Sequence, residues 1–219
     1  MTVKRDGAGM FISFEGIEGS GKTTQALLLT EFLSSRGYRT FLTREPGGTA
    51  IGDRIRELLL DPEHREMTPM TELLLYEAAR AQHLREGILP ALQEGLIVIT
   101  DRFSDSTTAY QGYGRCLDAV AIAVLDGVAT GGEKPDLTIL LDLPVERGVT
   151  RNREVKKTDR LEMEETEFHE RVRGGFLEIA AADPQRVKVV DATGTVEAVS
   201  LRVREVVSSR LPAPARDPS

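Results

Sequence analysis

Residues 16–23 constrain the fold of this chain more than any other segment, because they spell a complete phosphate loop, G-x-x-x-x-G-K-T. The loop follows a short apolar run at 10–15, which is typical of a buried parallel strand. It opens a stretch at 22–35 in which apolar residues recur at helical spacing. Since a strand, a glycine-rich turn and a helix are the setting in which this motif binds phosphate, the sequence predicts a nucleotide site here.

Each fixed position of the loop has a chemical reason. Its glycines let backbone N–H groups turn toward phosphate oxygens without a side chain in the way. Lys22 can reach the β- and γ-phosphates, and Thr23 offers a hydroxyl to Mg²⁺. The helix that starts there aims its positive end at the same anion. We predict that ATP is bound with Mg²⁺ by Gly16, Ile17, Glu18, Gly19, Ser20, Gly21, Lys22, Thr23 and Thr24.

Strands and helices alternate along the rest of the chain. Further strands are predicted at 39–43, 96–100, 137–143 and 186–190. Helices are predicted at about 51–60, 70–85 and 86–94, with a last amphipathic helix that runs to about residue 208. This order predicts an α/β fold, in which a parallel five-stranded sheet is covered by helices on both faces.

The domain organisation predicted from the sequence is simple. We expect one domain over 10–210, preceded by a flexible arm at 1–9 and followed by a disordered, proline-rich tail at 211–219. No apolar run approaches the ~20 residues that span a bilayer, and the first residues do not resemble a secretory signal. A cytoplasmic protein is therefore expected.

Composition excludes several kinds of partner and site. The net charge of −7 argues against a surface that binds nucleic acid, although a few arginines can still form a local positive pocket. Cys116 is the single cysteine, so an intrachain disulfide or a thiolate metal cluster is excluded. The three histidines, His64, His83 and His169, lack metal-binding spacing and are interpreted as packing or surface residues.

The end of the strand at 96–100 helps to separate a kinase from other phosphate-loop proteins. The chain has no N-K-x-D guanine reader, and Asp101-Arg102 follows the strand where many motors carry Asp-Glu. An arginine suits a phosphorylated acceptor better than the activation of water, although it could also be a structural ion-pair partner. Asp142 also ends a strand, but Pro144 marks a helix start beside it, so Asp101 with Thr23 is favoured as the metal site.

Residues 147–160 interrupt the alternation with a segment that is rich in arginine and lysine. A solvated helix face is the ordinary interpretation of such a run. A mobile lid that brings cations to a phosphate is the alternative, and the position of the segment after a strand of a nucleotide-binding sheet favours it.

Four segments in order give the chain a resemblance to the bacterial thymidylate kinases over roughly 10–208. They read FEGIEGSGKTT at 14–24, TREPGGT at 43–49, YEAARAQH at 76–83 and DRFSDSTTAYQG at 101–112. The resemblance implies a nucleoside-monophosphate kinase fold with a small lid. It also implies transfer of the γ-phosphate of ATP to dTMP, to give dTDP and ADP, by an enzyme that is usually a homodimer.

The resemblance also implies roles for residues around the acceptor. Arg44 and Arg102 match residues that hold the dTMP phosphate. Glu18 matches an acid that approaches the 3′-hydroxyl of the sugar, and Tyr110 matches a tyrosine that packs under the deoxyribose. An acid inside a phosphate loop repels the ligand unless it holds a hydroxyl, a metal or an arginine, which is consistent with the role implied for Glu18.

The base-side residues come from two of the four segments. Tyr76 matches an aromatic residue that stacks on thymine, and Arg80, four residues later and on the same helix face, matches an arginine that binds a base carbonyl. Thr107 and Gln111 match polar positions beside the base. Without the resemblance, the pair of Tyr76 and Arg80 would be interpreted as a core aromatic beside a surface arginine.

The phosphate loop itself has no basic residue between Gly16 and Gly21. This resembles the subclass of thymidylate kinases in which the lid supplies the catalytic arginine. Arg151 and Arg153 are the candidates, with Arg147 and Arg160 as supports. The predicted catalytic residues are Lys22, Arg102, Arg151, Arg153 and Glu18.

Two other functions stay open at this point. A kinase for another nucleotide, or for a nucleoside, would share the phosphate loop, but a nucleoside kinase has less use for Arg44 and Arg102. An ATP-dependent switch that acts on a protein partner would need no acceptor pocket. Assays with and without each acceptor distinguish the three.

Overall fold

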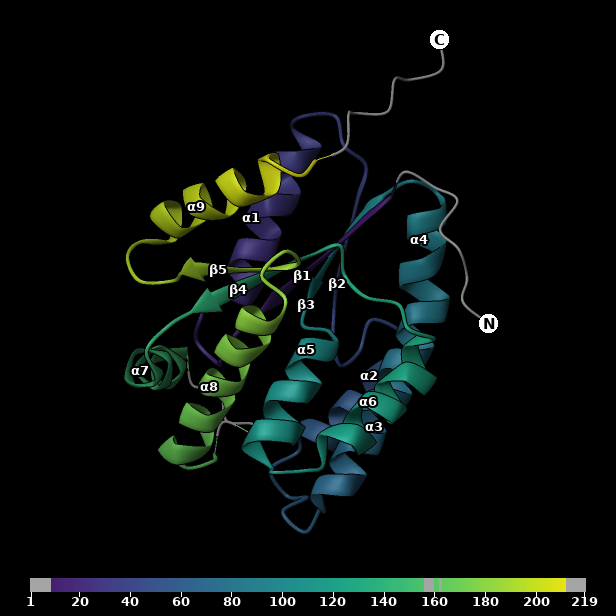
Figure 1. Ribbon diagram of the computed structural model, residues 1–219, viewed down its shortest axis with the longest axis vertical. Coiled ribbons are helices and arrows are strands. Elements are labelled where there is room, and N and C mark those ends of the chain that lie inside the picture. Colours follow the sequence, from purple (N-terminus) through teal and green to yellow (C-terminus); the bar gives the residue numbers. More distant parts are fainter. Residues whose placement is uncertain (1–8, 156–159, 162, 212–219) are drawn as a thin grey trace.

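The computed structural model describes residues 9–155, 160–161 and 163–211 (Figure 1). It confirms the α/β fold with a parallel five-stranded sheet, in the order β2-β3-β1-β4-β5. The strands lie within a residue of the predicted ranges, at Met10–Glu15 (β1), Thr40–Arg44 (β2), Ile97–Asp101 (β3), Leu137–Asp142 (β4) and Val187–Asp191 (β5).

Helices cover both faces of the sheet, as predicted. On one face, α1 (Lys22–Ser34) and α9 (Val196–Ser208) pack against alternate residues of β1, β3 and β4. The intervening residues, such as Phe11 and Leu140, face a second layer that includes α8 (Thr166–Ala182) and the helices that follow α3. Figure 1 shows α1 and α9 together on one side of the sheet and the larger group of helices on the other.

The remaining helices include two that continue into π-helical turns. The predicted helices at 51–60 and 70–94 correspond to α2 (Ala50–Leu60) and to α3 (Pro69–His83), which runs into η1 (Leu84–Ile88) and α4 (Leu89–Gln93). Likewise α5 (Ser104–Thr107) runs into η2 (Thr108–Gly114), which leads to α6 (Ala119–Thr130). Such π-helical turns are frequent at functional sites.

Three helical stretches were not predicted, for different reasons. The segment at 104–114 is interrupted by glycines and wound partly as a π-helix, so its side chains do not follow the 3.6-residue period. Helix α6 is apolar around most of its circumference, and α8 carries two adjacent glycines at its middle. The first two features remove the amphipathic period on which prediction depends. In α8 the buried residues recur at helical spacing from Phe168 to Ala180, but the glycines lower its predicted helix propensity.

The segments predicted to be mobile are described in part. The cationic segment at 147–160 begins in α7 (Val145–Val155), while 156–159 lie outside the described residues, as do 1–8 and 212–219. Leu211, assigned above to the tail, is described and packs against the core beneath α1 and α9. Over the part of the chain that the structure describes, no helix has the length and apolar character to cross a membrane.

Candidate active site

The carboxyl ends of the parallel strands meet at one edge of the sheet, and the predicted site residues follow them. Phe14 of β1 is in register with Asp101 of β3, and Arg44 of β2 is in register with the same residue. The phosphate loop follows β1 directly. Because ligands of open α/β sheets bind outside the carboxyl ends of the strands, this edge is the expected position of the site.

The phosphate loop is fixed against the first turn of α7. Gly19 has a φ of 71°, in the left-handed region that glycine adopts without strain. A Cβ at Gly19 would collide with the backbone of Gly148, and a Cβ at Gly148 would meet the carbonyl oxygen of Glu18. The two backbones are therefore in direct contact, which requires glycine on both sides.

The side chain of Lys22 is folded back onto the loop. Its Nζ donates to the carbonyl oxygens of Gly16 and Ile17, at 2.9 and 2.8 Å. Burial and the positive charge of Arg102 lower the pKa of Lys22 to about 8, although nearby carboxylates oppose the shift. A buried ammonium of this kind gains a strong partner when a phosphate enters, so the loop is prepared for an anion.

Thr23 and Asp101 meet at the mouth of the loop, where the Thr23 hydroxyl donates to Asp101 Oδ2 at 2.5 Å. A hydroxyl and a carboxylate are the hard oxygen ligands that Mg²⁺ accepts, so this donor set fits the cation. Within the described ranges, no cluster of three or more His, Cys, Asp or Glu residues could hold a metal. Mg²⁺ commonly takes one or two protein ligands and completes its shell with phosphate and water.

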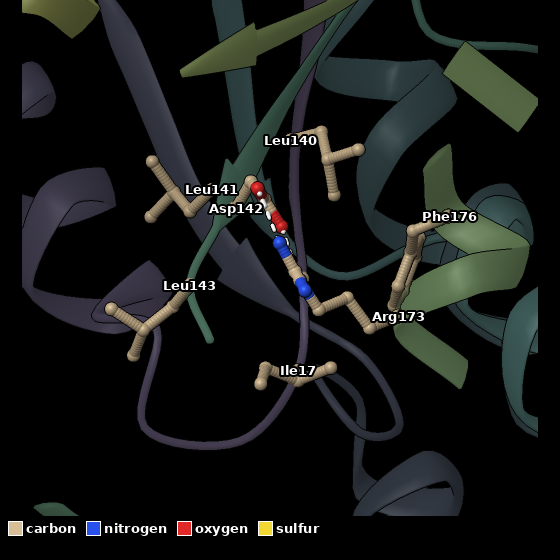
Figure 2. A pocket seen from close by; sticks show the side chains of 8 residues that line it. Ile17, Leu140, Leu141, Asp142, Leu143, Arg173 and Phe176 are labelled. Atoms are coloured by element: carbon tan, nitrogen blue, oxygen red, sulfur yellow. Dashed lines mark hydrogen bonds and ion pairs between the residues drawn. The ribbon is translucent and has the colours of Figure 1, made fainter. Parts of the chain in front are cut away.

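The alternative metal residue, Asp142, has another partner. Arg173 of α8 donates from Nε and Nη2 to the two Asp142 oxygens, at 2.7 and 3.0 Å. Figure 2 shows the two side chains pointing toward each other at a small crevice that Ile17 and Phe176 also line. Since the arginine fork occupies both carboxylate oxygens, this geometry favours Asp101 as the metal candidate.

Glu18 joins the phosphate loop to the segment that follows β3. Arg102 Nη2 donates to Glu18 Oε1 at 2.7 Å, and the Tyr110 hydroxyl donates to Oε2 at 2.6 Å. The Arg102 guanidinium also stacks over the Tyr110 ring, 4.8 Å from its centroid. Burial alone would raise the pKa of Glu18, but the charges of Arg102 and Lys22 and the bond from Tyr110 outweigh it and lower that pKa.

Arg102 has a left-handed backbone, with a φ of 77°, which is costly for a residue with a side chain. Three hydrogen bonds hold it: Arg102 N donates to Phe14 O at 2.9 Å, Thr100 Oγ1 donates to Arg102 O at 2.9 Å, and Phe103 N donates to Glu15 Oε1 at 2.7 Å. Strain of this kind persists where the surrounding structure fixes a functional group.

Two more arginines approach the same region. Arg44, at the end of β2, is exposed and lies 3.6 Å from Asp53. Arg56 of α2 is half-buried and donates to Pro46 O at 2.9 Å. Burial, and then the charges of Arg44 and Arg102, lower the pKa of Arg56, so the three guanidinium groups repel one another. An anion between them would relieve this repulsion.

The residues predicted to border the base come from α3 and from the helix formed by α5 and η2. Arg80 is 2% exposed and pairs with Glu45 and Glu77, at 2.9 and 2.6 Å. Its Nη2 also donates to Thr107 Oγ1 on α5, at 2.8 Å. Desolvation opposes the charge of Arg80, but the two carboxylates outweigh it and raise its pKa. Tyr76 is half-buried on the same face of α3, one turn before Arg80.

Gln111 is held by an acid that the sequence did not single out. Its Nε2 donates to Oε1 of Glu72 on α3, at 2.8 Å. Glu72 is 0% exposed and also pairs with Arg115 and Arg160, at 3.2 and 2.5 Å. The structure therefore brings Arg160, predicted as a support for the lid charge, to the far end of α3 rather than to the phosphate loop.

The other lid arginines differ in how they are placed. Arg151 of α7 reaches the phosphate loop, where its Nη1 donates to Gly19 O at 3.2 Å. Arg147 is exposed, and the side chain of Arg153 lies outside the part of the chain that is described. Arg151 is thus the lid candidate that the geometry brings to the loop.

Several site residues escaped prediction because their importance depends on distant partners. His169 of α8 lies 3.6 Å from Glu18 Oε2, although its sequence context gave no signal. Arg56 looks like any arginine of an amphipathic helix. Glu15 and Glu45 lie inside the matched segments at 14–24 and 43–49, so that signal was present but was not used.

Comparisons with known proteins agree with this geometry. A family model described as thymidylate kinase matches residues 14–203. The thymidylate kinase of Trichlorobacter lovleyi is 50% identical over 211 residues, which cover 94% of this chain and 100% of that protein. The thymidylate kinase of Geobacter sulfurreducens is 51% identical over 210 residues, which cover 93% and 99%.

A solved structure is similar as well. The crystal structure of thymidylate kinase from Ehrlichia chaffeensis superposes with a TM-score of 0.74 at 38% identity. The match covers 91% of this chain and 98% of that one. Sequence and structure thus agree over nearly the whole length of both proteins.

Proposed function

The chain belongs to the thymidylate kinase family, and from this premise we propose how its own residues move the γ-phosphate of ATP to dTMP. The activity itself, phosphotransfer to dTMP that gives dTDP and ADP, follows from relatives about half identical over almost their full length. The assignment of roles to residues is our proposal.

The cluster formed by Glu18, Arg102 and Tyr110 is the observation that carries this proposal. Glu18 belongs to the phosphate loop, whereas Arg102 and Tyr110 belong to the segment after β3, and hydrogen bonds of 2.6–2.7 Å join them. A donor phosphate on the loop and an acceptor phosphate on Arg102 would therefore be neighbours. That adjacency is what direct transfer requires.

Acceptor binding is assigned to the arginines that converge on this point. Arg102, Arg44 and Arg56 bind the dTMP phosphate, and the repulsion among them supports an anion in their midst. Glu18 accepts from the 3′-hydroxyl of the sugar, and Tyr110 packs under the deoxyribose. The acceptor oxygen is already anionic at neutral pH, so no residue is needed as a strong base.

Donor binding is assigned to the loop backbone and Lys22. Lys22 exchanges its bonds to Gly16 and Ile17 for the β- and γ-phosphates. Thr23 and Asp101 would hold Mg²⁺, whose charge, when it is bound with ATP, offsets that of the phosphates. Arg151, already on the loop backbone, adds a cation near the transferring group, and Arg153 follows on the same helix.

The base is assigned to the region between α3 and the helix formed by α5 and η2. Tyr76 stacks on thymine, Arg80 donates to a base carbonyl, and Thr107 and Gln111 border the base. The buried pairs of Arg80 with Glu45 and Glu77 support this role, since they hold a rigid donor fork in one orientation.

A coupled assay of ADP release tests the proposal. The enzyme with ATP and Mg²⁺ is given dTMP, dUMP, dCMP, thymidine or no acceptor, and Lys22→Met serves as the blank. We expect fast turnover with dTMP and background rates with thymidine or without an acceptor. Equal ADP release without any acceptor would contradict the assignment of the acceptor site.

We also propose that the enzyme is a homodimer, joined through α6 and its neighbours. Val120, Val124 and Val128 follow one face of α6 at exposed fractions of 70%, 60% and 75%. Ile51 and Leu58 of α2 are exposed too, and both helices pack on α3. Exposed apolar residues that share one helix face, as on α6, are typical of an interface.

A charge placed on that face tests the dimer. We expect the variant Val124→Asp to elute as a monomer in size-exclusion chromatography with light scattering. The matched control is Leu201→Asp on α9, which is 65% exposed on the opposite side of the sheet and should leave the dimer intact. Equal behaviour of the two variants contradicts this interface.

The remaining assignments concern the domain organisation of the chain and its location in the cell. We propose that 10–210 form one domain and that 147–160 act as a lid over the phosphates. The contacts of Arg151 with Gly19 and of Arg160 with Glu72 support the lid, since they anchor the segment near both ends. The location in the cytoplasm, where ATP is available, stays a prediction.

A further inference from the structure

Two side-chain hydrogen bonds connect α3 to the helix formed by α5 and η2. Arg80 donates to Thr107 at 2.8 Å, and Gln111 donates to Glu72 at 2.8 Å. The partners are spaced eight residues apart on α3 and four apart on the other helix. Tyr76 lies midway between Glu72 and Arg80, so a base stacked on Tyr76 would lie between the two bonds.

The partner of Gln111 decides which end of its amide faces the base. Glu72 also accepts from Arg115 Nε and Nη2, both at 3.2 Å, and pairs with Arg160 at 2.5 Å. Burial raises the pKa of Glu72, but Arg115, Gln111 and Arg160 outweigh it and lower the pKa, so the carboxylate is ionised. An ionised carboxylate accepts hydrogen bonds and donates none. Gln111 must therefore turn its NH₂ toward Glu72 and its carbonyl oxygen away.

We infer that Glu72 is a positioning residue that sets base specificity: by holding the amide nitrogen of Gln111, it presents the Gln111 carbonyl oxygen to the base as an acceptor. The inference rests on the proposed binding of thymine beside Gln111. Thymine carries a hydrogen on N3 and can donate to this oxygen, as can uracil, which has the same edge. Cytosine has an acceptor at N3 and would leave two acceptors facing each other.

Arg80, one turn beyond Tyr76 on α3, also favours thymine over cytosine. Its guanidinium has donors and no acceptor, so it suits the O4 carbonyl of thymine and not the amino group of cytosine. Glu45 and Glu77 hold Arg80 in place, as Glu72 holds Gln111. Each base-reading group is therefore oriented by a buried acid, and discrimination comes from the polar groups that the wrong base would leave unpaired.

The variant Glu72→Gln tests the inference, because a glutamine can donate or accept and no longer dictates the direction of the Gln111 amide. We expect the dTMP-to-dCMP ratio of kcat/KM to fall about tenfold, mainly through KM, while kcat for dTMP stays nearly constant. The dTMP-to-dUMP ratio should stay unchanged, since the two bases share the edge that Gln111 reads. An unchanged dTMP-to-dCMP ratio would overturn the inference.

The variant Arg115→Gln is the matched control. It removes an ion-pair partner of Glu72 and leaves the acceptor of Gln111 in place. We expect its dTMP-to-dCMP ratio to equal that of the wild type. A fall as large as that of Glu72→Gln would mean that the ion-pair cluster, and not the amide direction, sets the ratio.

A second variant covers the case in which Glu72→Gln does not fold, as a thermal melt would reveal. Glu72→Asp keeps the negative charge but shortens the side chain by one methylene, which withdraws the oxygen that accepts from both Gln111 and Arg115. The ratio should therefore fall here as well, and an unchanged ratio would overturn the role of Glu72. Wild-type enzyme that turns over dTMP and dCMP equally would contradict the proposed base site itself. If the wild-type enzyme prefers dTMP to dCMP and the variant has the same preference, only the role of Glu72 is overturned.

Discussion

The proposed donor and acceptor sides of this site are built by different means. The donor side is a loop of consecutive residues, 16–23, whose backbone is fixed by β1, α1 and the contact with α7. The acceptor side is assembled from side chains of β2, α2, α3 and the segment after β3. These side chains keep their positions through buried carboxylates such as Glu45 and Glu72.

Because of this difference, the two sides are sensitive to different substitutions. A loop that binds with its backbone is insensitive to most side-chain changes and sensitive to the few residues that touch phosphate or backbone. A side-chain pocket loses affinity when either the binding group or the acid behind it is removed, because a buried charge is left unpaired. Substitutions on the two sides should therefore separate the kinetic constants for ATP and dTMP.

Lys22→Met should have the largest effect. It removes the one cation of the loop that is aimed at the transferring phosphate, so we expect kcat to fall at least about 10³-fold. The Kd for dTMP, measured by calorimetry without ATP, should change less than about threefold, because Lys22 does not belong to the acceptor pocket. A comparable loss of dTMP affinity would show that the two sides are not separable.

Arg102→Gln should have the next largest effect, and this effect should fall on the acceptor side. We expect kcat/KM for dTMP to fall about 10²-fold, since the arginine holds Glu18 and is the proposed ligand of the acceptor phosphate. ATP binding, followed by fluorescence titration of a labelled analogue, should be nearly unchanged. Arg44→Gln is the comparison, with a smaller loss expected because its side chain is 59% exposed. Equal losses for the two arginines would contradict a central role for Arg102.

The same contrast explains what could be predicted from the sequence. The strands and the phosphate loop depend on local patterns, such as the apolar run at 10–15 and the spacing of Gly16, Gly21 and Lys22, so their positions were predicted within a residue. The residues of the acceptor side were found through a resemblance to known enzymes. Their roles there are still predictions.

What the sequence could not provide was the support for those residues. Glu72 and Glu45 contact partners about 40 residues away, and no periodic pattern encodes such a contact. The same holds for Arg160, whose position in a cationic segment suggested the phosphates, although its partner is Glu72. Long-range pairs become visible once the fold brings the elements together.

Glu45→Gln should have a moderate effect and would sharpen the comparison. Glu45 accepts from Arg80 Nε at 2.9 Å and lies 3.0 Å from His83 Nδ1, so its charge holds the base-reading arginine. We expect KM for dTMP to rise about tenfold with KM for ATP unchanged, as steady-state kinetics would measure. Glu94→Gln is the control, because its pair with Arg39 is exposed and surface pairs contribute little. A rise in KM for ATP would mean that the acid supports both sides.

Glu15→Gln should have the smallest effect on catalysis, and it tests a second acid that, like Glu18, joins the two sides. Glu15 ends β1 before the loop, yet it accepts from Phe103 N and Ser106 Oγ beyond β3, at 2.7 and 2.5 Å.

Burial, reinforced by Asp105, raises the pKa of Glu15 from 4.5 to about 8, so the folded enzyme keeps a proton that the unfolded chain releases. Stability from this group is therefore present below pH 4.5 and is lost as pH rises toward 8. The free energy of unfolding, measured with urea between pH 5.5 and 7.5, should fall less in Glu15→Gln than in the wild type, by on the order of 2 kcal/mol. If the free energy of unfolding depends on pH equally in the wild type and the variant, Glu15 is ionised in the folded enzyme. The strand before the loop and the segment after β3 are then joined by a charge.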